Sequence, residues 1–189
     1  DSTIVSSKGV FIDDGVVIGA NSIIEQGVII GRNCHIGSFV ILGEDGFEVK
    51  KINGINKVIK HDGLLIIDEE VVVKSLSKID KGIMGIDSKI AFNSVIDSHV
   101  HIGHSVSVGR QSLIVSNTLL SGSSTIGSSV YVGPGCTISN GVIIGDNSRV
   151  TLGSTVVSKV LKNQQVSGYF STDHKTFLKQ RAKIMLLAE

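Results

Sequence analysis

The sequence predicts an all-β chain wound into a parallel β-helix, and three observations support this fold class. Aliphatic side chains recur at every sixth position in two stretches, from Ile12 to Leu42 and from Met84 to Val156. Four positions after nearly every one of them stands a small or β-branched residue, and directly after many of them stands glycine. An α-helix of 3.6 residues per turn cannot keep a period of six on one face, whereas short strands joined by regular corners can.

The repeat of six also indicates how the coils are built. In each repeat the aliphatic residue and the residue four positions later face inward, because successive side chains of a strand point to opposite faces. The glycine-rich position gives the backbone the freedom that a corner needs. Three repeats make one coil of 18 residues, and successive coils stack about 4.8 Å apart, like neighbouring strands of a parallel sheet.

Two interruptions of the period divide the chain. Residues 44–65, GEDGFEVKKINGINKVIKHDGL, have no period of six, and we interpret them as a loop that protrudes from one corner. The step from Ile79 to Met84 is five residues, which indicates a slip of one residue. The expected divisions are the first coils over 1–43, the protruding loop over 44–65, the main coils with the active site over 66–158, and an extended segment with a helix over 159–189.

The C-terminal segment predicts a helix of about four turns. Ser171 or Thr172 is the expected N-cap, and Phe177, Ile184 and Leu187 share one face of the helix. We expect this helix to cover the last coil, because the backbone edge of that coil would otherwise be open.

Composition excludes several classes of protein. Lys and Arg number 18 against 17 Asp and Glu, so the basic excess typical of a nucleic-acid binder is absent. The longest apolar runs are far shorter than the roughly 20 residues of a transmembrane helix. No signal peptide is visible at the start, although the chain begins at Asp1 without a Met.

The two cysteines, Cys34 and Cys136, fall at inward positions of distant coils. We therefore expect both to be buried, unpaired small hydrophobes rather than a disulfide. So low a cysteine count favours a reducing, cytoplasmic location.

Three of the six histidines cluster in the segment SHVHIGHSV. Val100 and Ile102 are the inward residues there, so His99, His101 and His104 all point outward. An exposed polar patch is the alternative interpretation, but three histidines within six positions favour a functional site.

Counting one coil along the chain adds a second element to this site. Gly122 lies 18 residues after His104, and Asn117 lies 18 residues after His99. We therefore expect His104 next to the backbone of Gly122, one strand spacing away. A base beside a free backbone N–H suits acyl transfer, because the base takes a proton from the nucleophile while the N–H stabilises the oxyanion.

A metal site is an alternative for the same histidines. The spacing of five between His99 and His104 resembles the two-histidine element of the γ-class carbonic anhydrases, but the histidines of that motif occupy different positions within the repeat. A third ligand is also needed, and the nearest histidine upstream is His61, in the protruding loop. We therefore expect no metal.

Charged residues near the interruptions have two interpretations each. Asp80 and Lys81 at the slip are either turn residues or contacts to a substrate. The loop lysines either contact phosphates or are solvated, and they are Lys50, Lys51, Lys57 and Lys60.

These motifs resemble those of the lipid A acyltransferases, which comprise UDP-N-acetylglucosamine O-acyltransferase and UDP-3-O-acylglucosamine N-acyltransferase. The segment His101-Ile102-Gly103-His104, followed by Asn117 and Gly122, is similar to their active-site coil. The N-acyltransferase branch is favoured by the segments Asp45-Gly46-Phe47 and Ile79-Asp80-Lys81-Gly82 and by the extended segment before the terminal helix.

Two features depart from the family pattern. Ser105 follows the second histidine where the O-acyltransferase has an aspartate. The N-acyltransferase carries an N-terminal uridine-binding domain, whereas here the repeat is already running at Val10. Either that domain is missing from this sequence, or the protein is a shorter relative that acylates another nucleotide-linked amino sugar.

The resemblance implies a left-handed coil and a cytoplasmic homotrimer with its sites between adjacent subunits. It implies His104 as the general base, the Gly122 N–H as the oxyanion hole, and His101 and Asn117 near the acceptor sugar. Further candidates for substrate binding are His99, Asp45 and Phe47.

The implied reaction moves an acyl group from a thioester, on coenzyme A or acyl carrier protein, to the amine of a nucleotide-linked amino sugar. No permanently bound cofactor is expected. Three alternatives stay open: a sugar acetyltransferase that uses acetyl-coenzyme A on another acceptor, a γ-carbonic-anhydrase-like metalloenzyme, and a non-catalytic β-helix that serves as a scaffold.

Overall fold

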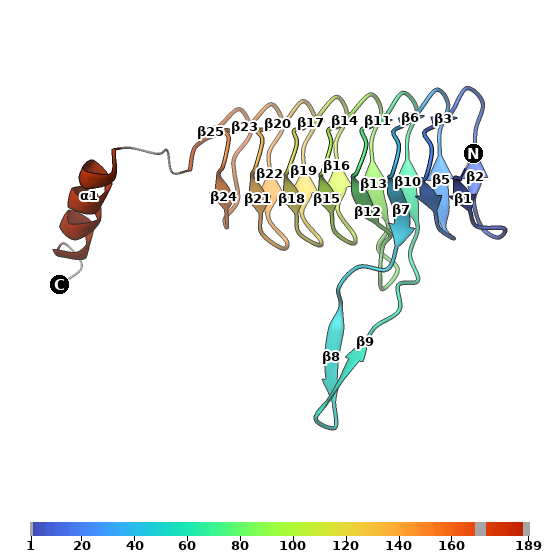
Figure 1. The fold of residues 1–189 in the computed structure, drawn as a ribbon, viewed down its shortest axis with the longest axis horizontal. Helices are drawn as coiled ribbons and strands as arrows, with labels where there is room; N and C mark the ends of the chain where they lie inside the picture. Colours follow the sequence, from blue (N-terminus) through green and yellow to red (C-terminus); the bar gives the residue numbers. More distant parts are fainter. Residues whose placement is uncertain (1, 169–172, 187–189) are drawn as a thin grey trace.

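The chain is a left-handed parallel β-helix of short strands, followed by one α-helix (Figure 1). The computed structural model describes residues 2–168 and 173–186. Three parallel sheets of eight, seven and eight strands form the sides of the coil, so the predicted fold class is confirmed.

The strands of each sheet stack in chain order. The first sheet contains β1 (Ile4–Val5), β4 (Ile23–Ile24), β7 (Ile41–Glu44), β12 (Lys78–Asp80), β15 (His101–Ile102), β18 (Leu119–Leu120), β21 (Thr137–Ile138) and β24 (Thr155–Val156). The second contains β2 (Phe11–Ile12), β5 (Val28–Ile30), β10 (Leu65–Ile67), β13 (Ser88–Ile90), β16 (Ser107–Val108), β19 (Thr125–Ile126) and β22 (Ile143–Ile144). The third contains β3 (Val17–Ile18), β6 (His35–Ile36), β11 (Val72–Val73), β14 (Val95–Ile96), β17 (Leu113–Ile114), β20 (Tyr131–Val132), β23 (Arg149–Val150) and β25 (Gln165–Val166).

The aliphatic residues at every sixth position fill the core, as the period predicts. Ile102 pairs with Leu120, which pairs with Ile138, and all three side chains are fully buried. Ile12 is 37% exposed because its coil lies at the N-terminal end of the stack. Met84 contradicts its assignment as an inward residue: it is 54% exposed, and its neighbour Ile83 is buried instead.

The interruption at Met84 is an inserted turn rather than a slip of one residue. Ile79 pairs with Ile102, so this coil is longer than the regular 18 residues. The extra residues form a turn after β12, closed by mutual backbone hydrogen bonds between Ile83 and Ile86. The turn places Met84 on the outside, with a positive φ of 56°.

The protruding loop is a β-hairpin that projects from the side of the β-helix (Figure 1). It consists of β8 (Val49–Ile52) and β9 (Ile55–Val58), joined by Asn53 and Gly54. Both linking residues have positive φ, which is the backbone of a type I′ turn and the reason why Asn-Gly is favoured there. The hairpin leaves the stack after β7 and the inserted turn leaves it after β12, so both emerge from the same corner, one coil apart.

The last element is the helix α1 (His174–Leu186), and Asp173 caps it by accepting a hydrogen bond from the Thr176 N–H at 3.1 Å. The expected caps Ser171 and Thr172 lie outside the described residues. The expectation that this helix covers the last coil is wrong, since none of its described side chains is buried and it lies away from the coils (Figure 1). The chain before it closes the stack instead: β25 pairs with β23, and Val160 pairs with Ile144.

Both cysteines are buried and unpaired, as predicted. Burial raises the pKa of the Cys34 and Cys136 thiols, so both stay protonated at neutral pH. In the part of the chain that the structure describes, no helix has the length and apolar character needed to cross a membrane.

Candidate active site

The candidate site lies where the inserted corner of the β-helix meets the histidine cluster. A pocket of about 400 Å³ opens there. It is lined by Phe47, Glu48, Asp80, His101, Gly103, His104, Leu119, Ser121, Gly122 and Asn140. Its walls therefore come from the stem of the hairpin and from four successive coils of the β-helix.

The imidazole of His104 lies directly against Gly122. His104 is in the corner after β15, and Gly122 is in the equivalent corner after β18, one coil further on. A Cβ atom at Gly122 would lie 2.6 Å from His104 Nε2 and 2.7 Å from Cε1, which is closer than real Cβ contacts. Only glycine leaves room for the His104 ring, so the structure brings this pair together as the offset of 18 residues predicts.

The backbone of Gly122 is held on its carbonyl side. The carbonyl oxygen accepts hydrogen bonds from Asn140 Nδ2 at 2.7 Å and from the Gly141 N–H at 3.1 Å. Within residues 2–168 and 173–186 the Gly122 N–H has no acceptor. A Cβ atom at Gly103 would lie 2.8 Å from the Gly122 nitrogen, so glycine at position 103 keeps this N–H uncovered.

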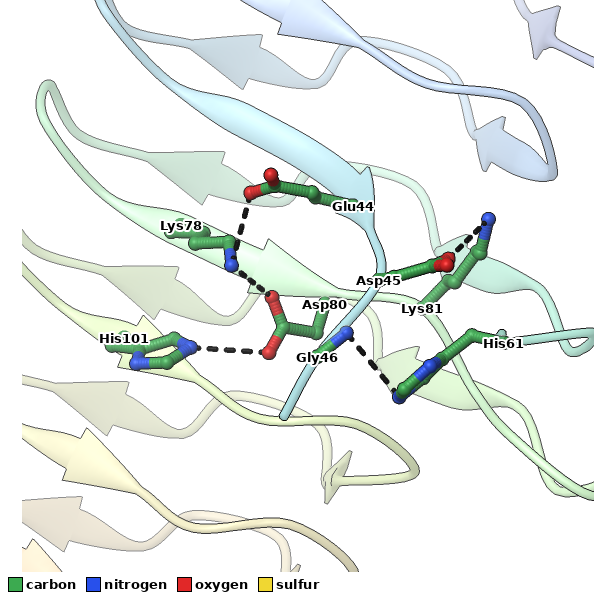
Figure 2. A network of polar contacts seen from close by, with 8 residues as sticks. All are labelled: Glu44, Asp45, Gly46, His61, Lys78, Asp80, Lys81 and His101. Carbon is green, nitrogen blue, oxygen red and sulfur yellow. Dashed lines mark hydrogen bonds and ion pairs between the residues drawn. The ribbon is translucent and has the colours of Figure 1, made fainter. Parts of the chain in front are cut away.

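Asp80 is the buried acidic centre of a polar network at the edge of this pocket (Figure 2). Its Oδ2 lies 3.1 Å from His101 Nε2, and its Oδ1 lies 3.0 Å from Lys78 Nζ, an ion pair without the alignment of a hydrogen bond. Lys78 also pairs with Glu44 at 3.0 Å. Burial alone would lower the pKa of Lys78, but the two carboxylates outweigh burial and raise that pKa. The network fixes the orientation of His101.

His61 lies next to the site as a buried histidine, and it is 3% exposed. The Gly46 nitrogen lies 3.2 Å from its Nε2 (Figure 2). The Ile59 carbonyl oxygen lies 3.2 Å from its Nδ1. Because an amide N–H can only donate, Nε2 is the acceptor and the proton is on Nδ1. The rings of His61 and His104 meet edge to face, with centroids 5.3 Å apart and planes at 70°.

From the sequence, Asp80 was expected as either a turn residue or a substrate contact, and His61 only as a possible metal ligand. Lys78, Glu44 and Asn140 were missed. Lys78 could have been found from the strand register, because it pairs directly with His101 across β12 and β15. No periodicity could identify His61, since it lies in the segment without repeats.

Three of the predicted site residues lie outside this pocket. His99 and Asn117 are exposed at the preceding corner of the coil, each with a φ of 58°. Asp45 faces the other side of the hairpin stem, where its Oδ1 lies 2.9 Å from Lys81 Nζ. Burial alone would raise the pKa of Asp45, but the Lys81 ammonium outweighs burial and lowers it. Phe47 lines the pocket and is 87% exposed.

The loop lysines lie away from this pocket. Lys50 and Lys57 are directly opposite each other across the hairpin, and Lys60 lies in the neighbouring pocket that contains Asp45. Among the described residues, no three or more His, Cys, Asp or Glu side chains are arranged to hold a metal ion.

Comparison with protein families finds the bacterial transferase hexapeptide model over residues 9–44 and 123–157. Among curated proteins, the chain is 41% identical over 135 residues to the UDP-3-O-acylglucosamine N-acyltransferase of Campylobacter jejuni subsp. doylei, and 41% identical over 133 residues to that of Rhizobium meliloti. These matches cover 71% and 70% of this chain but 42% and 37% of those proteins. The chain thus spans only about two fifths of the length of the relatives it matches.

Solved structures show the same fold. The UDP-N-acetylglucosamine O-acyltransferase from Moraxella catarrhalis matches 95% of this chain and 76% of its own length, with a TM-score of 0.69 and 20% identity. The UDP-N-acetylglucosamine acyltransferase from Campylobacter jejuni matches 96% of this chain and 82% of its own, with the same TM-score and identity. The chain therefore contains the hexapeptide repeats of bacterial transferases over residues 9–44 and 123–157, is similar in sequence to N-acyltransferases, and shares its fold with O-acyltransferases.

Proposed function

We propose that this protein transfers an acyl group from a thioester to the amine of a nucleotide-linked amino sugar, with His104 as the general base. The observation that carries the proposal is the packing of His104 Nε2 against the backbone of Gly122 at the open pocket. The names of the curated relatives support this reaction class.

The proposed chemistry uses two groups of this chain. The neutral amine of the acceptor attacks the thioester carbonyl carbon, and neutral His104 takes the proton that the amine loses. The negative charge that develops on the carbonyl oxygen is stabilised by the free Gly122 N–H. When the carbon–sulfur bond breaks, protonated His104 returns the proton to the departing thiolate, so the base is regenerated.

The remaining groups of the pocket suit substrate binding. His101, oriented by Asp80, offers a polar contact for the acceptor sugar. Leu119 and Phe47 give the pocket an apolar wall for the acyl or pantetheine chain.

His99, Asn117 and Asp45 are proposed to contact substrate only in a homotrimer. They lie outside the pocket of their own chain, so their contact needs a site shared between adjacent subunits. Coenzyme A or acyl carrier protein is the proposed donor carrier, and the cytoplasm is the proposed location.

The test is a thioester-consumption assay with purified protein. It would combine nucleotide-linked amino sugars, UDP-3-O-acylglucosamine included, with acetyl, hydroxybutyryl and long-chain donors on coenzyme A and carrier protein. We expect turnover with one pair and a loss of about 1,000-fold in His104→Ala. The matched control is His35→Ala, because His35 is an exposed histidine of the third sheet. A folded His104→Ala protein with unchanged turnover would contradict the proposal.

A further inference from the structure

We propose that His61 is a positioning residue for His104: it is held as a neutral ring by two backbone groups and confines the His104 imidazole over Gly122. This inference rests on the proposed function and adds a residue to it. His61 does not line the pocket, and it acts on the pocket through its contacts with His104 and with Gly46 of the hairpin stem.

His104 lacks the usual means of fixing a catalytic imidazole. A general-base histidine is commonly oriented by an acceptor at its second ring nitrogen. Here His104 Nδ1 is buried and has no hydrogen-bond partner within the described residues. The neighbouring Ser105 is already engaged, since its Oγ accepts from the Ile83 N–H and donates to the Ile86 carbonyl. Packing must therefore hold the ring.

His61 supplies that packing from a fixed position. Its ring is pinned at both nitrogens, by the Ile59 carbonyl and the Gly46 N–H, so it cannot turn without losing a buried hydrogen bond. Its edge-to-face contact with His104 leaves that ring between His61 and Gly122.

Gly46 makes this arrangement possible. A Cβ atom there would lie 2.8 Å from Asp80 Oδ2, 3.2 Å from His61 Nε2 and 3.3 Å from His104 Cδ2. The hairpin stem therefore passes between Asp80, which orients His101, and the edge-to-face pair of His61 and His104, with no space for a side chain.

Contacts between the hairpin stem and the inserted turn fix the position of His61. Asp62, the next residue, accepts a hydrogen bond from the Met84 N–H at 2.7 Å, and the Gly63 N–H donates to the Gly82 carbonyl at 3.0 Å. The inserted turn thus anchors the returning strand of the hairpin stem, and with it the His61 ring.

The test is steady-state kinetics of the full chain with His61→Gln, His104→Ala and His35→Gln. Glutamine can accept from Gly46 and donate to Ile59, but it has no ring to confine His104. We expect His61→Gln to keep the thermal midpoint within about 2 °C and the KM of both substrates, while kcat falls about tenfold. Unchanged kinetics are expected for His35→Gln.

A spectroscopic measurement accompanies the kinetics. Long-range ¹H–¹⁵N spectra of the imidazoles should show His61 as the neutral Nδ1–H tautomer, and the His104 signal should broaden or shift in His61→Gln. Wild-type kcat in His61→Gln, with His104→Ala inactive, would overturn this inference alone. An active His104→Ala protein would overturn the proposed function as well.

Discussion

His101 Nε2 lies 3.1 Å from Asp80 Oδ2, and this contact joins two neighbouring strands of the first sheet. Lys78 is the direct cross-strand partner of His101, and it lies on the same carboxylate from the other side. Because Asp80 is buried between these two neighbours, we expect this side of the pocket to depend on the stability of the coil.

Asp80→Asn should lower both stability and activity. The substitution removes a buried charge and leaves the Lys78 ammonium with Glu44 alone, so we expect a loss of about 3 kcal/mol in the free energy of unfolding. Urea denaturation at one fixed protein concentration measures it. The matched control is Asp68→Asn, whose pair with Lys89 is long and partly exposed, and which should cost less than about 0.5 kcal/mol. Equal losses in the two variants would refute the assignment.

Gly122→Ala should abolish turnover without unfolding the protein. Its Cβ atom would meet His104 Nε2, so the imidazole must move away from the N–H of residue 122. We expect kcat to fall at least about 100-fold. Gly135→Asn is the control, because Gly135 has a φ of 67°, which asparagine tolerates, and space around its Cβ position. Substantial residual activity in Gly122→Ala would argue against this pair.

Both cysteines should resist alkylation in the native protein. Burial raises the pKa of the Cys34 and Cys136 thiols, so little thiolate is present at pH 8 and the sulfur atoms are covered. Mass spectrometry after iodoacetamide treatment should find no adduct without denaturant and two adducts in urea. The thiols of the unfolded chain have the lower pKa, so they lose their protons at a lower pH than the buried thiols do. The free energy of unfolding should therefore also fall as pH rises above about 8.5. A native adduct at either cysteine would contradict the buried assignment.

Asp45→Asn should make the stability less dependent on acid pH. The Lys81 ammonium holds the folded-state pKa of Asp45 below its ordinary value of 3.8. The stabilisation is therefore present above pH 3.8 and is lost as pH falls through the folded-state pKa. Melting temperatures of the two proteins from pH 6 to pH 2 should converge at the acid end. The effect is small because this pair is partly exposed, and parallel curves would refute it.

The sequence predicted the parts of the molecule in which the period is unbroken. The offset from His104 to Gly122 could be counted because both lie in regular coils, whose pairing is fixed by the buried aliphatic residues. The same count correctly stacks Asn117 on His99, but it could not show that this corner is separate from the pocket. Met84 was misplaced because it is an apolar residue six positions before Ile90, as the period requires. It nevertheless belongs to the inserted turn, where its side chain is exposed.

His61 and Gly46 could not have been predicted in this way. Their proximity to His104 and Asp80 depends on how two irregular segments stack at one corner, and no local pattern encodes that packing. The Asn-Gly turn of the hairpin, in contrast, was present in the sequence as a local signal at residues 53 and 54.

The pairing register resumes unchanged after each insertion, with Ile67 opposite both Ile30 and Ile90. The number of residues at this corner can therefore differ from coil to coil while the paired strands on either side keep their alignment. Because the hairpin stem and the inserted turn also hold His61 against His104, we expect changes of length to be tolerated at the tip of the hairpin, between β8 and β9, and to disturb the proposed catalytic pair when they are made in the stem or in the turn.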